Sequence, residues 1–378
     1  MIWRSSVEHL RARGHDVRVL TTDHREADVE ARNDLNVYRE LLWYWHEHEF
    51  PRLSVLERLR VERHNHSVLT RHLADHRPQV VTWWPMGGMS LSMIERCRRQ
   101  GLPAVGVVCD DWLVYGSRVD AWQRGLARLG PLGETVGKAA GAPGPVNFDS
   151  AASWVFISRF TLDCAREMGG HRLPRSTVAH AGVDAARFRP GTPHPWGGGL
   201  LYVGRVDPRK GIATALRALT RLDAGFRVDV VGDGDPRHAA ELRELSASLG
   251  LDGRFALHPG VDHARLAERY TRADALVFPV TWPEPWGLVP LEAMASGIPV
   301  IATGTGGSGE YLLHEENCLL VEPSDDAGLA AAAMRLRDDR DLRTQLREGG
   351  LATAGRYSET AFNEAVEWEI RRAVDDVA

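Results

Sequence analysis

The sequence predicts an α/β protein built from two doubly wound domains. Two series of short, continuously apolar segments alternate with amphipathic stretches of ten or more residues. This alternation is typical of parallel sheets covered by helices on both faces. Between the series lies Phe188–Gly199, "FRPGTPHPWGGG", whose three prolines and four glycines form a linker composition. The 378 residues suit two domains, since a domain takes roughly 100–200 residues.

The first series opens with a predicted helix, Trp3–Arg13, which places Val7 and Leu10 on one face and ends at Gly14. Its predicted strands are Val17–Thr21, Val80–Trp83, Ala104–Val108 and Trp154–Ile157, with a helix over Ser90–Arg99. The Gly- and Pro-rich stretch Gly130–Gly144 is expected to be a surface loop. A helix–Gly–strand opening normally follows an earlier strand. The first domain is therefore expected to lack its first strand and the glycine loop after it.

The second series is more regular. Its predicted strands are Leu200–Val203, Val228–Val231, Phe255–His258, Ala275–Phe278 and Val300–Ala302. The predicted helices between them are Ile212–Leu222, Arg237–Leu249, Ala264–Arg272 and Val289–Ser296. The C-terminal stretch Ser358–Val377 has a helical pattern, with apolar positions at Phe362, Val366, Ile370 and Val374.

Composition excludes several classes of protein. The chain is 43% hydrophobic and 26% charged, which is ordinary for a globular protein and excludes a disordered chain, a collagen-like repeat and a coiled coil. A net charge of −5 argues against a bulk nucleic-acid binder. The cysteines Cys97, Cys109, Cys164 and Cys318 lie far apart without a CxxC pair, so a reducing cytosol is the simpler expectation. No apolar run reaches the roughly 18 residues of a membrane span, and no signal peptide is visible.

The strongest chemical signal is "FPVTWPEPWGLVPLEAMASGIP", Phe278–Pro299. A strand ends near Phe278 and a helix begins near Gly287, so the loop between them is aimed at a helix N-terminus. Anions and other ligands bind at such places in open α/β sheets. Glu284 lies just before this helix and Glu292 lies on it. A carboxylate beside an anion site is electrostatically unfavourable unless the carboxylate itself binds a ligand group, such as sugar hydroxyls. The alternative is that both are solvated surface charges.

This segment resembles the E-x7-E segment of the family 4 retaining glycosyltransferases (glycosyl transferases group 1), which have the GT-B fold. The resemblance continues upstream. "LLYVGRVDPRKGI", Leu200–Ile212, is similar to the G-R-x4-K-G donor-phosphate loop, and "VVGDGDP", Val230–Pro236, follows the next strand as in the family. "AGVDAARFRP", Ala181–Pro190, resembles the segment that closes the first domain, with Ala181 in place of the usual Asn. "FISRFTLDCAREMG", Phe156–Gly169, matches the preceding strand and helix.

The resemblance implies two Rossmann-like domains facing a cleft. The first would comprise residues 1–190 and bind the acceptor, the second 191–355 and bind the nucleotide sugar, and a helix over 356–378 would cross back to the first. By resemblance, Arg205 and Lys210 would hold the diphosphate, Glu284 the donor sugar and Glu292 the ribose. The remaining implied donor contacts are Gly204, Gly232, His258, Gly260, Trp286, Gly287 and Leu288.

Elementary physics supports this transfer of roles. The charge on the diphosphate grows when its bond to the sugar breaks, so cations at that place stabilise the transition state more than the ground state. Only two of the 46 basic residues are lysines, Lys138 and Lys210, and Lys210 falls in the phosphate motif. The catalytic set implied by the resemblance is Glu284, Arg205, Lys210 and Asp110.

The acceptor side carries a weaker signal. "CDDW", Cys109–Trp112, follows a predicted strand where many family members have His-Asp, so Cys109 replaces that His and Asp110 matches the Asp. Asp111 is part of the same local variant. Trp83 and Trp84 also end a strand, and together with Trp112 they could stack on a sugar or another ring. For all three tryptophans, packing in the core is the alternative.

The predicted function is retaining transfer of a sugar from a nucleotide-diphosphate sugar to an acceptor hydroxyl, in the cytoplasm, without a metal or another cofactor. The acceptor would be a glycan, a lipid or a small molecule. Two alternatives remain, a GT-B protein that only binds or scaffolds, and a GT-B sugar-nucleotide epimerase. The histidine pairs His46/His48, His64/His66 and His72/His76 are expected to be solvated rather than to form a zinc site, and His72 and His76 share a face of an Arg-rich helix. For the apolar segment Leu41–Trp45, "LLWYW", core packing is the simpler interpretation, and peripheral membrane contact is the alternative.

Overall fold

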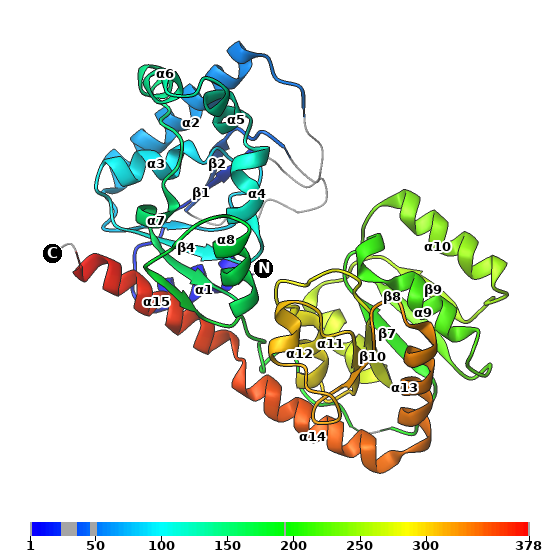
Figure 1. Cartoon of the computed structure of the whole chain (residues 1–378). Helices are drawn as coiled ribbons and strands as arrows, with labels where there is room; N and C mark the ends of the chain where they lie inside the picture. The colour runs from blue at the N-terminus through cyan, green and yellow to red at the C-terminus, as the bar shows by residue number, and fades with distance from the viewer. Residues whose placement is uncertain (1, 24–35, 46–50, 193, 377–378) are drawn as a thin grey trace. The chain divides into compact units, whose positions relative to one another are not determined.

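The computed structural model of the chain describes residues 2–23, 36–45, 51–192 and 194–376 (Figure 1). The chain divides into two compact units. Unit 1 comprises Met1–Ala179 and Asn363–Ala378, and unit 2 comprises His180–Phe362. Each unit contains a parallel sheet, which confirms the predicted α/β class. Within the described ranges, no helix is long and apolar enough to cross a membrane.

The strands of unit 1 form two separate sheets. The larger, four-stranded sheet has the order β3 (Val81–Trp83), β4 (Ala104–Val108), β5 (Ser153–Phe156) and β6 (Ser176–Val178). In the smaller one, β1 (Val19–Thr22) pairs in parallel with β2 (Val37–Leu41). A doubly wound sheet of order 3-2-1-4-5-6 places its first strand between the second and the fourth. No strand in the described part of the chain joins the two sheets, and the absence of a first strand between them remains a prediction.

The helices of unit 1 follow from local signals. They are α1 (Ile2–Ala12), α2 (Val55–His76), α3 (Ser92–Arg99), α4 (Trp112–Val119), α5 (Ala121–Arg128), α6 (Leu132–Ala140), α7 (Phe148–Ala151) and α8 (Arg159–Glu167). A capping box starts α2: the Ser54 hydroxyl accepts a hydrogen bond from the Glu57 amide, and the Glu57 carboxylate accepts one from the Ser54 amide. Asp120 caps α5 by accepting hydrogen bonds from the amides of Trp122 and Gln123.

The predicted loop over 130–144 is wrong, because α6 occupies most of it. The two glycines within α6 allow close packing and do not form turns. A Cβ at Gly133 would lie 2.2 Å from the Leu126 carbonyl oxygen, and one at Gly137 would lie 3.0 Å from that of Ala142. Only glycine lets α6 lie this close to its neighbours. Composition alone cannot distinguish this use of glycine from a flexible loop.

Unit 2 contains a six-stranded parallel sheet of order β12-β11-β10-β7-β8-β9. The strands are β7 (Gly199–Val203), β8 (Arg227–Val231), β9 (Phe255–His258), β10 (Ala275–Phe278), β11 (Val300–Ala302) and β12 (Leu319–Leu320). The chain starts at β7 in the middle, winds outward to β9, and returns to the other side of β7 for β10. The reversal between β7 and β10 is the switch point of the sheet, where open α/β sheets bind ligands at the carboxyl ends of their strands.

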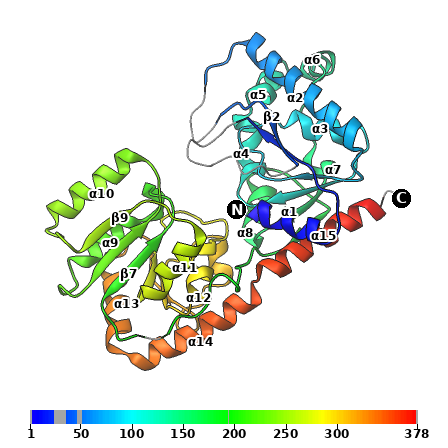
Figure 2. The ribbon, with the colours of Figure 1, turned by 180° about the vertical axis from the view of Figure 1, so that it is seen from behind.

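Helices cover both faces of this sheet (Figures 1 and 2). They are α9 (Ile212–Leu219), α10 (Pro236–Ser248), α11 (His263–Arg272), α12 (Leu288–Ala295), α13 (Asp326–Asp338) and α14 (Arg340–Arg356), with a short 3-10 turn at Pro208–Lys210. Every residue of β7 and β10 is buried, which is why both read as continuous apolar runs.

The last helix, α15 (Glu359–Asp375), lies along α1 (Figure 2). The Ser6 hydroxyl donates a hydrogen bond of 2.6 Å to the Asn363 side-chain oxygen. His9 and His15 each place a ring nitrogen 3.0 Å from the Glu367 carboxylate. Because of the His15 contact first, and those of Arg371 and His9, the pKa of Glu367 falls to about 2. These polar contacts attach the end of α15 to unit 1.

Candidate functional site

Two predicted donor-binding residues meet at the switch point of unit 2. The loop after β7 carries Lys210 and the loop after β10 carries Glu284, and the Lys210 Nζ lies 2.6 Å from the Glu284 Oε2. The two strands are neighbours in the sheet, so their carboxyl ends bring together residues 74 positions apart. Both side chains keep some exposure, 17% for Lys210 and 13% for Glu284. The pair is therefore accessible to a ligand at the strand ends.

The two loops are held together through backbone and aromatic contacts. The Thr281 amide and hydroxyl both donate to the Arg209 carbonyl, at 2.8 and 3.1 Å. The Trp282 indole N–H donates to Glu284 Oε2 at 3.0 Å, and the ammonium of Lys210 lies 5.3 Å from the centroid of the Trp282 ring. Trp282 thus fixes the orientation of the Lys210–Glu284 pair. Sequence analysis did not single it out, although its place two residues before Glu284 was a usable signal.

The helix N-terminus expected after this loop is present. Gly287 is the N-cap of α12 with φ +81°, and Leu288 is the first helical residue. The amides of a first helical turn have no partner within the helix, so they and the helix dipole favour an anion. The backbone before α12 is fixed as well, because the Gly307 amide donates to the Glu284 carbonyl at 2.7 Å.

Glu292 points from α12 toward α11. Its Oε2 accepts a hydrogen bond of 2.9 Å from the Tyr270 hydroxyl. Burial raises the pKa of the Glu292 carboxyl above its ordinary value, and the Tyr270 hydrogen bond opposes that rise. Tyr270, itself buried, is a positioning residue that sequence analysis missed, because no pattern in α11 links it to a carboxylate on another helix.

The other predicted donor residues line the ends of β7, β8 and β9. A Cβ at Gly232 would lie 2.0 Å from the Gly204 carbonyl oxygen, so these two strand ends can approach only because residue 232 is glycine. Arg205 is exposed beside them. The imidazole of His258 lies 3.0 Å from Asp229 Oδ1. Gly260 follows β9, and its amide donates to Asp233 Oδ1 at 3.1 Å.

Trp286 was predicted to contact the donor, but the structure buries its side chain. It is 1% exposed, and its indole N–H donates to the Ala181 carbonyl at 2.7 Å. The His180 ring stacks on it at 4.6 Å between centroids, and the Tyr311 ring lies at 4.8 Å. We therefore correct its role: Trp286 packs in an aromatic cluster of unit 2 that supports the loop before α12.

On unit 1, the residues after β4 form a small polar turn. Asp110 Oδ1 accepts from the Trp112 amide at 2.9 Å, and Oδ2 accepts from the Tyr115 hydroxyl at 3.3 Å. Burial raises the pKa of the Asp110 carboxyl. Burial, with the nearby Asp110 charge, raises the pKa of the Cys109 thiol to about 12, so this residue cannot replace an imidazole as a base at neutral pH. Asp111, half-buried, occupies the N-cap position of α4 without a capping hydrogen bond from its side chain.

Two of the three predicted acceptor tryptophans are core residues. Trp112 is 1% exposed and packs edge-on against Trp154 and Phe148. Trp83 is 6% exposed within the same core cluster. The stacking expectation is therefore wrong for both. Trp84 is half-buried and remains a candidate.

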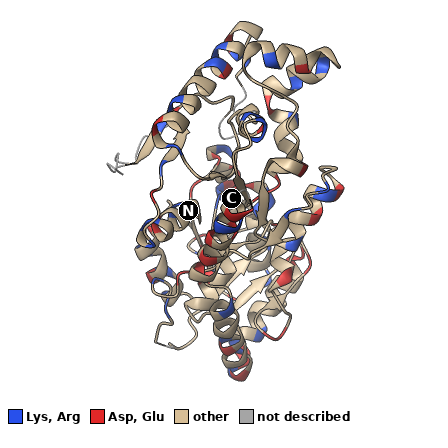
Figure 3. Ribbon diagram, turned by 90° about the vertical axis from the view of Figure 1, so that its left-hand side faces the viewer, with Lys and Arg blue, Asp and Glu red and all other residues tan. Residues whose placement is uncertain are grey.

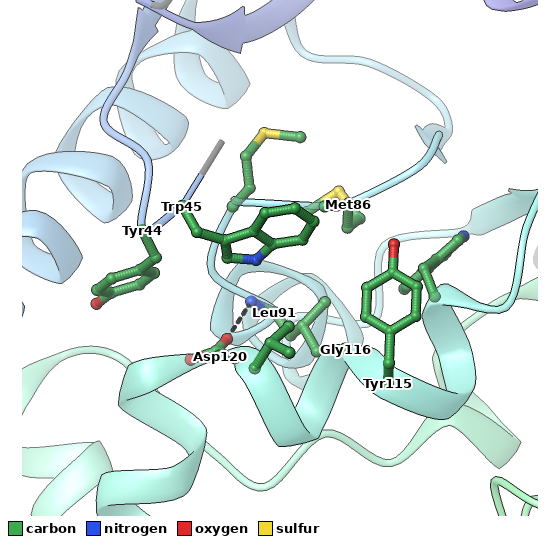
Figure 4. A pocket seen from close by; sticks show the side chains of 11 residues that line it. Tyr44, Trp45, Met86, Leu91, Tyr115, Gly116 and Asp120 are labelled. Carbon is green, nitrogen blue, oxygen red and sulfur yellow. Dashed lines mark hydrogen bonds between the residues drawn. The ribbon is translucent and has the colours of Figure 1, made fainter. Parts of the chain in front are cut away.

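Beside this turn, a small cavity of about 10 Å³ has room for about one water molecule (Figure 4). Among the residues that line it are Trp45, Met86, Tyr115 and Asp120. Asp120 Oδ2 accepts from the Leu91 amide at 2.9 Å, as the dashed line in Figure 4 shows. Sequence analysis missed Tyr115, which links this cavity to Asp110 through its hydroxyl.

Asp120 predicts a pH dependence of stability. Burial and the negative charge of Glu62 raise its pKa to about 7. In the folded state Asp120 keeps its proton up to about pH 7, whereas in the unfolded state it loses the proton near pH 4. The stabilisation that this protonation gives to the folded state is therefore complete below about pH 4 and is lost as the pH rises to about 7. Urea unfolding at pH 5 and pH 7 should show this loss, by up to about 2 kcal/mol, and Asp120→Asn should reduce it. An unchanged pH difference in the variant would contradict the assignment.

Histidines do not assemble a metal site in the described ranges, where no group of three or more His, Cys, Asp or Glu could hold a metal ion. His46 and His48 lie outside the described residues. His72, expected on a solvated helix face, is instead only 8% exposed, with Nε2 at 3.1 Å from the Glu40 carboxylate and its ring edge-on to Tyr38. That expectation is corrected for His72, because β2 covers this part of α2. It is also corrected for His66, which is 4% exposed and has Nε2 at 2.7 Å from the Ser92 hydroxyl.

Residues 199–352 match the sequence profile described as "Glycosyl transferases group 1". The matched residues include Lys210, Glu284 and Glu292. Glycogen synthase of Mycobacterium tuberculosis is 38% identical over 197 residues, covering 50% of this chain and 46% of that protein. Residues 199–352 form a group 1 glycosyltransferase domain. The chain spans about half the length of the curated relatives it matches.

Solved structures extend the likeness to the whole chain. Sucrose-phosphate synthase from Thermosynechococcus elongatus has a TM-score of 0.73 at 23% identity, covering 98% of this chain and 92% of that one. HepE from Anabaena, in complex with UDP and glucose, has a TM-score of 0.63 at 18% identity, covering 84% and 83%. At these identities the likeness shows the fold. The glycosyltransferase domain and unit 1 together have the GT-B fold of two Rossmann-like domains.

Proposed function

We propose that the protein transfers a sugar, with retention of its anomeric configuration, from a nucleotide-diphosphate sugar to an acceptor hydroxyl. The observation that carries this proposal is the Lys210–Glu284 pair, 2.6 Å apart at the switch point and just before the N-terminus of α12. A cation and a helix N-terminus suit a diphosphate. The adjacent carboxylate suits sugar hydroxyls, which donate hydrogen bonds to it. A nucleotide sugar joins these two chemistries in one molecule.

The proposed reaction breaks the bond between the anomeric carbon and the diphosphate oxygen. The acceptor oxygen forms a bond to that carbon, and the acceptor proton passes to the departing diphosphate. Lys210 and exposed Arg205 would balance the charge that grows on the leaving group. Glu284 would hold the sugar, and the backbone amides of Gly287 and Leu288 would contact sugar or phosphate. Because these cations and amides already serve the phosphates, the proposal requires no divalent metal.

Glu292 would bind the ribose hydroxyls of the donor. Gly204, Gly232, His258 and Gly260 would border the nucleotide at the ends of β7, β8 and β9. The solved relative HepE, which binds UDP and glucose, supports UDP as the first nucleotide to test. The base, the sugar and the acceptor are to be found by titrating UDP, GDP and ADP and their sugars by calorimetry.

Unit 1 would bind the acceptor. Asp110 would contact the acceptor hydroxyl, because its carboxylate is held in place by the Trp112 amide and the Tyr115 hydroxyl. Burial raises its pKa. Trp84, Cys109 and Asp111 would lie around it. Closure of the two units around a cleft, which would exclude water, is part of the proposal. A transfer assay with candidate glycan, lipid and small-molecule acceptors in excess chelator tests both the reaction and its metal independence.

Glu292→Gln is expected to weaken binding of the nucleotide sugar by about 10- to 100-fold, because hydrogen bonds to a charged group contribute roughly 1.5–3 kcal/mol. Calorimetric titration measures this loss. Glu244→Gln, an exposed position on α10, is the matched control and should bind as the unmodified chain does. If Glu292→Gln binds the nucleotide sugar as tightly as the unmodified chain, Glu292 does not bind the ribose. The role of Lys210 is tested separately.

A further inference from the structure

Large apolar side chains are exposed together at one end of unit 1. The residues that form this α2–α6 surface are Val55, Leu56, Leu129, Leu132 and Val136, with exposed fractions from 41% to 78%. The start of α2 and α6 lie at the same end of the unit in Figures 1, 2 and 3. Beneath them, side chains before and on α2 pack in one cluster with Trp122 and Leu126 of α5. Segments distant in sequence thus expose apolar side chains at the same end of the unit.

The orientation of α6 is the reverse of that of an ordinary surface helix. Its buried side carries Gly133 and Gly137, whereas Leu132, Val136 and Ala139 face solvent. The spacing of these three residues, i, i+4 and i+7, places them along one stripe. A surface helix normally turns such a stripe toward the core. The outward stripe of α6 is therefore suited to an apolar environment outside the unit.

The same surface is basic in an acidic protein. The two segments that form it, residues 51–64 and 121–142, contain seven basic and three acidic residues, whereas the whole chain has a net charge of −5. One of the three acids, Glu62, is fully buried. Another, Glu134, is paired with Lys138 at 3.1 Å, so these two charges offset each other. Figure 3 shows Lys and Arg, in blue, along the helices at this end.

We propose that the α2–α6 surface docks on a membrane that contains anionic lipids. Leucine and valine side chains would enter the boundary between headgroups and acyl chains, while Arg124, Arg128 and their basic neighbours contact lipid phosphates. Stable docking generally needs an apolar and an electrostatic contribution together, and this surface supplies both. A second copy of the chain fits less well, because a twofold contact would press two basic surfaces together.

This proposal is independent of donor and acceptor chemistry and so goes beyond the proposed function. It also differs from the expectation for Leu41–Trp45, since Leu41 and Tyr44 are only 3% exposed and belong to the core. In the full chain, sedimentation with vesicles of equal parts phosphatidylglycerol and phosphatidylcholine should show binding. Binding should fall with added salt and be absent with phosphatidylcholine alone, because the basic residues would then lack anionic partners.

Two variants separate the contributions. Arg124→Gln with Arg128→Gln should weaken vesicle binding by about 25-fold, from roughly fivefold for each basic residue near the surface. Leu56→Ser with Leu132→Ser should weaken it by about tenfold or more, because exposed leucines would no longer enter the bilayer boundary. The matched controls are Arg243→Gln on α10 and Leu313→Ser, an exposed leucine of unit 2, and both should bind as the unmodified chain does.

The outcomes are decisive in either direction. All variants should keep the circular dichroism spectrum and melting temperature of the unmodified chain, because every changed side chain is exposed. Absence of vesicle binding by the unmodified chain would overturn the proposal, as would equal binding by the surface variants. If sedimentation velocity instead shows an oligomer that the leucine variant dissociates, the surface joins copies of the chain and the membrane proposal is wrong. Nucleotide titration, unaffected by either result, tests the proposed function separately.

Discussion

Lys210→Ala is expected to lower kcat/KM for sugar transfer by about 10²- to 10³-fold, the cost of removing one preorganised charge stabiliser in other enzymes. The lysine side chain provides a compact positive charge next to the amide dipoles of α12. Its removal also leaves the Glu284 carboxylate, 13% exposed, without its 2.6 Å partner and close to an incoming phosphate. Both effects raise the energy of a state in which negative charge grows on the leaving diphosphate.

The loss should fall mainly on kcat, because that charge is largest in the transition state. Lys138→Ala is the matched control, since Lys138 is the other lysine of the chain and lies on unit 1, 61% exposed. Lys210→Arg should recover part of the rate, because it restores charge but not the compact geometry. Steady-state kinetics with the donor identified by titration measures all three. Unchanged turnover in Lys210→Ala would overturn the role of this site.

Gly211→Ala is expected to destabilise the protein by about 2–5 kcal/mol and to impair donor binding. Gly211 has φ +72°, and a Cβ there would lie 1.8 Å from the Pro279 carbonyl oxygen. The left-handed backbone costs roughly 1–2 kcal/mol for a residue with a Cβ, and the overlap adds roughly 1–3 kcal/mol. The relief of this overlap must separate the Lys210 loop from the Glu284 loop, so nucleotide affinity should fall with stability.

Gly250→Ala is the matched control for this effect. Gly250 has φ +66°, but nothing lies within 4 Å of its added Cβ. The Gly250→Ala variant should therefore be destabilised only by the cost of the left-handed backbone, about 1–2 kcal/mol, and should keep its affinity for nucleotide. Urea unfolding monitored by circular dichroism, together with calorimetric titration, compares the two variants. Equal destabilisation in both would show that contact with Pro279 does not constrain the loops.

Local pattern was sufficient for the strands and helices of unit 2 from β7 to β11, whereas β12, α13 and α14 were not predicted. Ala275–Phe278 and Val300–Ala302 are strands with the predicted bounds, because strands buried on both faces must be continuously apolar. The strand–loop–helix around Glu284 was predictable for a related reason. A proline in the first turn and a glycine at the N-cap restrict where a helix can begin. The roles of the donor residues rest on resemblance and remain predictions.

Aromatic residues show where sequence reasoning fails. Trp112 and Trp286 stand in motifs beside candidate site residues, yet both are 1% exposed and pack in the cores of their units. A tryptophan after a strand can turn toward either the site or the core, and only the neighbouring elements decide which. Tyr115, Trp282 and Tyr270 are the converse cases. They hold Asp110, Glu284 and Glu292. The partners of Tyr115 and Tyr270 lie on another turn or helix, whereas Trp282 lies two residues before Glu284 in the same loop.

The sequence by itself determined the α/β class, the order of strands and helices from β7 to β11, and the positions of Lys210 and Glu284 after strand ends, because hydrophobic period and turn residues act locally. Only the tertiary structure decided that β7 and β10 are neighbours and that Lys210 meets Glu284. It also decided that the glycines of α6 face inward while its leucine and valine face solvent. The meeting of Lys210 and Glu284 depends on two strands that are far apart in the chain, and the orientation of α6 depends on its packing against Leu126 and Ala142. No local pattern encodes either.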